Sequence, residues 1–339
     1  MVLVAGIVVL TIRGGDGTGQ RAGGGMAHVH ALGVDPQDGA VYAGTHYGLF
    51  RVPEQGAATL VADRVQDFMG FTVVGANQYL ASGHPGEGQD GPSSLGLIES
   101  TDGGQTWRSL SLAGQADFHS LEARHGRVYG LNSMTGAFMV SEDRRTWETR
   151  SQTPMADFAV SPEAPEVLLA TTQQGVARSA DGGRSFEPVA GAPVLLLVSW
   201  AEDGTIVGVD PDGAVHSSTD GGLTWQPGGN LGAAPEALTA TGDGEVFAAV
   251  EGAILYSSMA DARSPCGTAS RKQCRTQKPA AVTPVSCRWW WRSSSPAAPP
   301  TRPTAPVGRS PRQRRSRRRS RYPGSLPAPS CHSGPRPMG

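Results

Sequence analysis

The sequence predicts an all-β fold, a six-bladed β-propeller with seven blades as the alternative. The first observation is a motif that occurs four times, with its aspartates at Asp102, Asp143, Asp181 and Asp220. These aspartates are 41, 38 and 39 residues apart, and a period near 40 is typical of a four-stranded propeller blade. The second observation is composition. Glycine accounts for 46 of 339 residues and aromatic residues for only 6%, which favours short strands and tight turns over long helices.

The repeated motif reads Ser-x-Asp-Gly-Gly-x-Ser/Thr followed by an aromatic residue. It occurs at 100–107, 179–186 and 218–225, and a shorter form without the glycines occurs at 141–147. We expect the carboxylate to accept hydrogen bonds from N–H groups of the turn, and the glycines to supply positive φ. The aromatic residue should anchor the hairpin in an apolar gap between strands; these residues are Trp107, Trp147, Phe186 and Trp225. Each motif therefore closes the hairpin between the last two strands of a blade, and the turn at 141–147 must differ.

The blades can be placed along the chain from the spacing of these turns. The first is expected to contain strands at His28–Val34, Val41–Gly44 and Leu49–Val52. The second runs from Asp67 to about Leu112, with strands at Phe71–Val74, Tyr79–Ala81 and Leu97–Ser100. The remaining four are expected to begin near Asp117, Asp157, Val194 and Ala237. Strands such as Thr205–Val209 alternate between two faces, as stacked sheets require.

The chain divides into three parts, at 1–25, 26–258 and 259–339. The apolar run Val2–Ile12 is too short to span a bilayer as a helix. It resembles the apolar part of a secretory signal or the end of a membrane anchor, and a glycine-rich linker follows it. We therefore expect an exported protein, extracellular or attached to the cell envelope. The alternative interpretation is an apolar terminus without a targeting role.

The last part, 259–339, is rich in Pro, Ser and Arg and contains all four cysteines. Its composition predicts disorder. If Ser258 and Ala260 use codons ending in G and Asp261 one ending in C, reading the gene one base earlier through Ser258–Ala262 yields Asp-Gly-Gly-Arg. We therefore interpret this tail as the product of a frameshift. The sixth blade would then lack its outermost strand and leave an open edge. The alternative is a basic arm for nucleic acid at Arg312–Arg321, although we do not expect nucleic acid as a partner.

Polar side chains are expected to gather at one mouth of the central channel. Residues two apart on a strand share a face, so one layer of the channel should contain His28, Asp67, Asp117 and Asp157. The next layer should contain His30, Met69 and His119. The loops that return to this mouth add His46 and His84. The intervening Phe68, Phe118 and Phe158 should face away from the channel.

Imidazole, carboxylate and thioether groups that converge could bind a transition metal, and copper or zinc suits this set. The candidate metal ligands are His28, His30 and His119. The same groups could serve acid–base chemistry, with Asp67 and Asp117 as candidates, although no catalytic residue is assigned. The alternative is structural: the aspartates would then satisfy N–H groups at strand starts, and the histidines would bond to loop backbone.

The four motifs resemble the Asp-box, or BNR, repeat of sialidase-like propellers, which also occurs in sortilin-type receptors and in a photosystem assembly factor. Over residues 26–258 the chain further resembles bacterial Asp-box propellers described as glycosylhydrolase-like. The segments that carry this resemblance are His28–His30, Thr45–Arg51, Asp67–Phe71, Ala81–Pro85 and Asp117–His119. Phe50–Pro53 looks like the Phe-Arg-Ile-Pro motif, whose arginine grips the substrate carboxylate of sialidases. The other two arginines and a Tyr–Glu pair do not follow, so we interpret Arg51 as an ordinary strand residue.

Three functional hypotheses follow. The leading one is a non-catalytic, exported or envelope-anchored monomer that binds a small ligand, glycan, metal or protein partner at the mouth. A membrane would be reached only through an N-terminal or lost C-terminal anchor. The second is a sialidase-like glycoside hydrolase, and the third is an assembly factor for a membrane complex.

Overall fold

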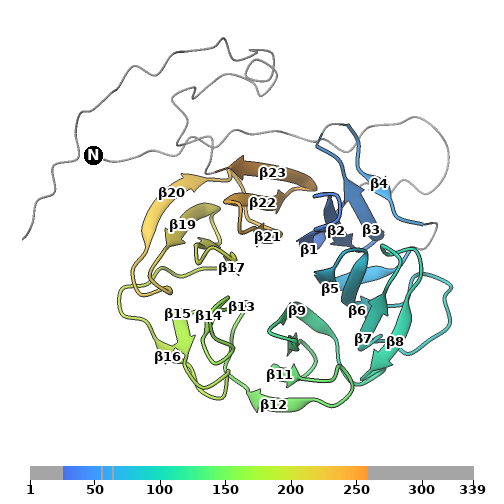
Figure 1. Cartoon of the computed structure of the whole chain (residues 1–339), viewed down its shortest axis with the longest axis horizontal. Coiled ribbons are helices and arrows are strands. Elements are labelled where there is room, and N and C mark those ends of the chain that lie inside the picture. The colour runs from blue at the N-terminus through green and yellow to red at the C-terminus, as the bar shows by residue number, and fades with distance from the viewer. Residues whose placement is uncertain (1–25, 55, 63–64, 259–339) are drawn as a thin grey trace, which may run out of the picture. The chain divides into compact units, whose positions relative to one another are not determined.

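The structure is a computed structural model that describes residues 26–54, 56–62 and 65–258. The described residues form 23 strands in six sheets and contain no helix. The sheets follow one another around a central channel (Figure 1). The predicted all-β propeller is therefore confirmed, with six blades. Within the described ranges, no helix is available to cross a membrane. The interpretations of the apolar run Val2–Ile12 and of the tail 259–339 lie outside the described residues.

Each blade is a meander of antiparallel strands numbered from the channel outwards. Blade 1 consists of β1 (Val29–Val34), β2 (Val41–Thr45), β3 (Gly48–Val52) and β4 (Thr59–Leu60). Blade 2 consists of β5 (Asp67–Gly75), β6 (Gln78–His84), β7 (Leu97–Ser100) and β8 (Arg108–Ser111). Blade 3 consists of β9 (Phe118–Arg124), β10 (Arg127–Asn132), β11 (Ala137–Ser141) and β12 (Glu148–Ser151).

The second half repeats this plan. Blade 4 consists of β13 (Phe158–Val160), β14 (Leu168–Thr172), β15 (Gly175–Ser179) and β16 (Glu187–Pro188). Blade 5 consists of β17 (Leu197–Trp200), β18 (Ile206–Val209), β19 (Ala214–Ser218) and β20 (Gln226–Asn230). Blade 6 has three strands within the described residues, β21 (Ala237–Ala240), β22 (Glu245–Val250) and β23 (Ala253–Ser258). The predicted blade positions are confirmed.

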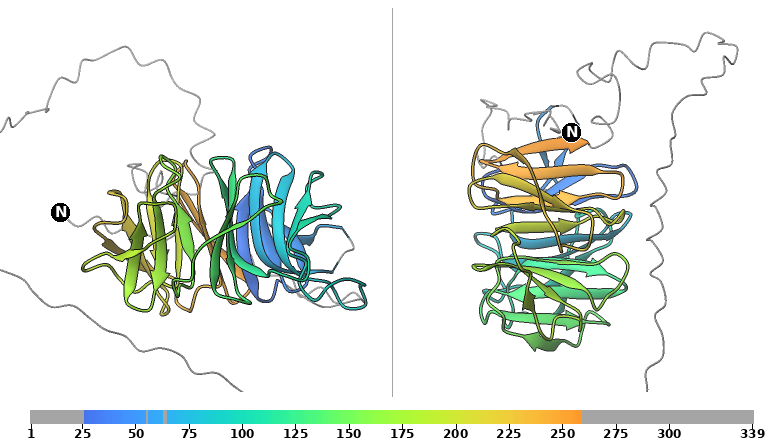
Figure 2. Two further views of the ribbon diagram at one scale, coloured as in Figure 1. Left: turned by 90° about the horizontal axis from the view of Figure 1, so that it is seen from below. Right: turned by 90° about the vertical axis from the view of Figure 1, so that its left-hand side faces the viewer.

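The strands of all six sheets run roughly along the channel, so the loops gather at its two ends (Figure 2). Strand register shows which loops share an end. Val29 at the start of β1 pairs with Thr45 at the end of β2, and Asp67 at the start of β5 pairs with His84 at the end of β6. The starts of the inner strands therefore lie beside the loops that connect the second and third strands.

The repeated turns have the predicted hydrogen bonds and the predicted place between the third and fourth strands. In the turn at 100–107, Asp102 Oδ1 accepts from the N–H of Thr106 at 2.9 Å, and Asp102 Oδ2 accepts from its hydroxyl at 2.6 Å. Gly103 and Gly104 have φ of 71° and 87°. The turn at 141–147 does differ: Arg144 takes the left-handed conformation, with φ of 63°.

The second glycine of each complete turn packs against the preceding blade. A Cβ atom on Gly183 in blade 4 would overlap the ring of Phe138 in blade 3. Equivalent overlaps would occur between Gly104 and Leu49, and between Gly222 and Leu169. Glycine is therefore required twice over at this position, for its positive φ and for the close approach of two blades.

The hydrophobic core lies between neighbouring blades rather than within them. Phe68, Phe118 and Phe158, which were predicted to face away from the channel, are each at most 3% exposed. Of the three, Phe158 borders the channel cavity. Phe68 packs against Trp107 and Phe118 against Trp147, with ring centroids 5.1 and 4.8 Å apart, so the turns' aromatic residues complete the core. Blade 1 and blade 6 share one apolar cluster, which closes the ring without a covalent link.

The packing at the turns predicts unequal costs for two Gly→Ala substitutions. Gly191 has φ of 76°, and no atom lies within 4 Å of the position that a methyl group would occupy. Gly191→Ala should therefore cost only the left-handed strain, about 1–2 kcal/mol. Gly183→Ala adds overpacking against Phe138, a further ~1–3 kcal/mol. Urea unfolding of both variants measures the difference. Equal losses of stability would show that the contact between blades 3 and 4 is not tight.

Candidate functional site

The channel holds a cavity of about 350 Å³ that the inner strands line. His30 and His119 border it near the starts of β1 and β9. Seven residues at this end form what we call the histidine mouth: His28, His30, His46, Asp67, His84, Asp117 and His119. All seven were predicted at one mouth from sequence. The structure arranges them as two groups, one from blades 1 and 2 and one from blades 2 and 3.

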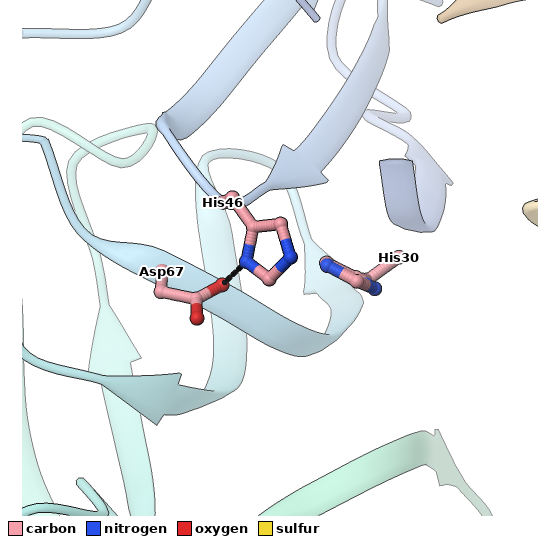
Figure 3. A group of neighbouring side chains, drawn as sticks. All are labelled: His30, His46 and Asp67. Carbon is pink, nitrogen blue, oxygen red and sulfur yellow. Dashed lines mark hydrogen bonds and ion pairs between the residues drawn. The ribbon is translucent and has the colours of Figure 1, made fainter. Parts of the chain in front are cut away.

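The first group consists of three imidazoles and one carboxylate. His46, in the loop between β2 and β3, has its ring centroid 4.5 Å from that of His30 and 5.2 Å from that of His28. His46 Nδ1 lies 2.8 Å from Asp67 Oδ1, at the start of β5. Figure 3 shows His46 between Asp67 and His30. Ligand atoms of His30, His46 and Asp67 all lie within 4.8 Å of one another.

The protonation of this group suits metal binding. A carboxylate only accepts hydrogen bonds, so His46 Nδ1 donates to Asp67, and Nε2 is the ring nitrogen left to bind a metal. Burial, aided by the neighbouring His46, lowers the pKa of His30 to about 4, so His30 is neutral at physiological pH. His30 Nε2 is buried without a hydrogen-bond partner in the part of the chain that the structure describes.

Backbone strain accompanies this group. His28 has φ of 55°, a left-handed conformation that is uncommon for residues other than glycine. It ends the extended backbone, so β1 begins at Val29 rather than at His28 as predicted. Six other non-glycine residues among those described also have positive φ, so this conformation alone does not mark a binding site.

The second group is centred on Asp117, whose side chain is only 6% exposed. Asp117 Oδ2 accepts from His119 Nε2 and from Ser133 Oγ, both at 2.8 Å. His84 Nε2 lies 3.6 Å from the same oxygen, and His84 Nδ1 lies 2.7 Å from the carbonyl oxygen of Ser93. Burial alone would raise the pKa of Asp117, but the bonds from His119 and Ser133 bring it below its usual value, so this carboxylate remains ionised.

Two other predicted residues have different surroundings. The ladder between β5 and β6 shifts register between Phe68 and Gly70, so Met69 lies in a β-bulge. At a bulge, side chains no longer alternate regularly between the two faces of the sheet, so the predicted position of Met69 beside the histidines does not follow. Asp157 joins blades 3 and 5: Ser120 Oγ donates to its Oδ1 at 2.6 Å and the N–H of Val198 to its Oδ2 at 3.0 Å. Both Asp157 oxygens therefore have partners in the frame of the channel.

Sequence reasoning missed a polar cluster deeper in the channel. Glu122 accepts from the N–H of Val160 at 3.0 Å and pairs with Arg124 at 3.2 Å. Arg124 also pairs with Glu202 and donates to the carbonyl oxygen of Trp200, both at 3.0 Å. These contacts brace blades 3, 4 and 5. The spacing Glu-x-Arg on β9 places both side chains on one face of the strand. Their further partners lie in other blades, so the sequence around β9 does not predict them.

Three further polar residues, Arg51, His125 and His216, are not part of the histidine mouth. Arg51 is on β3 and pairs with Asp38 of the loop between β1 and β2 at 2.9 Å, which confirms its interpretation as a strand residue. His125 lies 2.7 Å from the carbonyl oxygen of Ser161, and His216 is on β19.

Comparisons with known proteins show the fold. No protein-family model and no curated protein matches the chain. The solved structures that it resembles include a gluconolactonase from Xanthomonas campestris, with 10% identity, a TM-score of 0.55, and coverage of 68% of this chain and 86% of that one. YCF48 from Cyanidioschyzon merolae has 12% identity and a TM-score of 0.50, with coverage of 70% and 97%. YCF48 bound to D1 peptide has 19% identity and a TM-score of 0.44, with coverage of 69% and 80%.

The partly buried Glu122, whose side chain is 23% exposed, predicts a pH-dependent stability. Burial raises its pKa to about 7, so the folded protein binds this proton more tightly than the unfolded chain, and stability falls as pH rises from about 4.5 to 7. Glu122→Gln still accepts from Val160 N–H and carries no charge. Thermal or urea unfolding should therefore show the variant gaining roughly 1–3 kcal/mol on the wild type between pH 5 and pH 8. Parallel stability curves would contradict the raised pKa.

Proposed function

We propose that this propeller binds one first-row transition metal ion, copper(II) or zinc, at the histidine mouth. The observation that carries the proposal is the convergence of His30, His46 and Asp67, whose ligand atoms lie within 4.8 Å of one another. Imidazoles favour copper, zinc and nickel over calcium and magnesium, which prefer oxygen ligands. The metal is therefore the ligand that this mouth recognises.

In this proposal the imidazoles of His30 and His46 are two of the ligands. The third is His28, whose ring centroid lies 5.2 Å from that of His46. Asp67 fixes the ring of His46 through its hydrogen bond to Nδ1, the arrangement by which carboxylates orient metal-binding histidines. His46 takes the place that sequence analysis gave to His119, because His119 is bonded to Asp117 instead. Three protein ligands leave a fourth position open for water or another ligand.

Two features support burial of the ion rather than loose surface adsorption. His30 is neutral without a metal, so no proton competes for it near pH 7. Its buried Nε2 has no partner among the described residues, and an unpaired buried polar atom costs about 1–3 kcal/mol. A bound cation or its water would remove that cost.

The wider setting is also a proposal. Four turns with the Ser-x-Asp pattern support placing the chain with the Asp-box propellers of the sialidase-like group. The apolar run Val2–Ile12 supports a location outside the cytoplasm, in the envelope or the extracellular space. A glycoside hydrolase of the sialidase type has less support, because Arg51 pairs with Asp38 and does not line the channel cavity.

Zinc titration of the full-length chain tests the metal site. Cys266, Cys274, Cys287 and Cys331 should first be alkylated, since thiolates of the tail also bind zinc. Calorimetry and metal analysis should then find one zinc per chain. The double substitution His30→Ala/His46→Ala should abolish this binding, and Asp67→Asn should weaken it about 10- to 100-fold.

The matched control is His216→Ala, which removes an imidazole from β19 and should leave zinc affinity unchanged. Thermal unfolding checks that every variant is folded. Zinc binding of equal strength in the double variant, or none in the wild type, would refute the proposed function.

A further inference from the structure

The second group of the histidine mouth has the geometry of a proton-transfer pair. Asp117 is buried and ionised, and it receives the Nε2–H of His119 at 2.8 Å. The His119 ring is 44% exposed at the mouth. With Nε2 protonated, Nδ1 carries the lone pair, and the hydrogen bonds of the described residues include none at Nδ1. A buried carboxylate that fixes an accessible imidazole in one tautomer is the arrangement that activates nucleophiles in many hydrolases.

The orientation of Asp117 is itself fixed. Ser133 Oγ donates to the same oxygen as His119, and His84 faces that oxygen while its Nδ1 donates to the carbonyl oxygen of Ser93. Three side chains, those of Ser133, His84 and His119, therefore surround the single carboxylate of Asp117. An aspartate that merely satisfied the start of a strand, as Asp157 does through Ser120 and Val198, would not need two histidines.

The two groups face one space. His30 and His119 line the same cavity, near the starts of β1 and β9. A ligand at the open position of the proposed metal would therefore lie in the cavity that His119 also borders.

We propose that the histidine mouth hydrolyses a small carboxylic ester, with His119 as general base and Asp117 as its positioning residue. This inference depends on the proposed metal site and goes beyond a purely binding role. The bound metal would hold the attacking water and polarise the ester carbonyl, as zinc commonly does in hydrolysis.

The step balances without any co-reactant except water. His119 Nδ1 accepts a proton from the water while the water oxygen forms a bond to the carbonyl carbon, and the carbonyl π electrons move to its oxygen. When the carbonyl re-forms, the bond from carbon to the alkoxy oxygen breaks. His119 then returns its proton to the leaving alkoxide. The products are an alcohol and a carboxylic acid, which ionises in solvent.

The lining of the cavity favours an ester of a carboxylic acid over a phosphate ester. Phosphoryl transfer requires cationic groups around the anionic substrate. Among the described residues that line the cavity, Arg124 is the only Arg or Lys, and its guanidinium is held by Glu122, Glu202 and Trp200. A volume of about 350 Å³ lies at the small end of the range for ligand pockets, which limits the acyl group to a small one.

The test uses the full-length chain, loaded with zinc after alkylation of its cysteines, and p-nitrophenyl acetate as the probe. Zinc-dependent release of p-nitrophenol should exceed that of free zinc with imidazole. His119→Ala should lower kcat about 100-fold or more, with zinc affinity unchanged within about twofold. Asp117→Asn should lower kcat with little change in KM, since it disturbs only the tautomer of His119. If Asp117 had only a structural role, the substitution would instead lower the unfolding temperature.

The matched control is His216→Ala, which should hydrolyse the ester at the wild-type rate. Failure to bind zinc would overturn both this inference and the proposed function. Zinc binding without zinc-dependent hydrolysis above background, or hydrolysis that His119→Ala leaves intact, would overturn the inference alone and leave the metal site standing.

Discussion

Neighbouring sheets of the ring do not pair through their strands, so side chains must satisfy the backbone of the inner strands where two blades meet. Ser82 accepts from the N–H of Phe118, Glu122 from that of Val160, Asp157 from that of Val198 and Ser199 from that of Ala240. These bonds fix each inner strand relative to the next. The positions of the functional side chains follow, because the same strands begin at the histidine mouth.

Polar side chains whose hydrogen bonds join neighbouring blades differ from those that have no partner within the propeller. Both oxygens of Asp157 are used between blades, and Arg124 donates to two blades in addition to its carboxylate partners. By contrast, His30 Nε2 and Asp117 Oδ1 are buried without partners in the described part of the chain. They are two of six such side-chain atoms among the described residues, and both belong to the histidine mouth.

The sequence predicted what depends on local chemistry and missed what depends on neighbours in the ring. Asp102 and its equivalents bond within their own turns, so the repeat, its spacing and six blades could be read directly. The convergence of histidines followed from strand direction. The partner of each histidine did not, because the contact of His46 with Asp67 joins two blades. The bulge at Met69 and the brace of Glu122 with Arg124 likewise depend on packing that one strand does not encode.

The three aspartates at the starts of successive inner strands show how one position takes different roles. Asp67 meets the imidazole of His46 from the preceding blade, and Asp117 meets His119 of its own strand and His84 of the preceding blade. Asp157 meets a hydroxyl and a backbone N–H instead. The carboxylate is the same in all three blades, so the available partner decides its role. The imidazole partners lie at or just after the ends of the second strands in blades 1 and 2 and, for Asp117, also on β9 of blade 3. The histidines of the mouth therefore all belong to blades 1 to 3, with blades 4 to 6 as its frame.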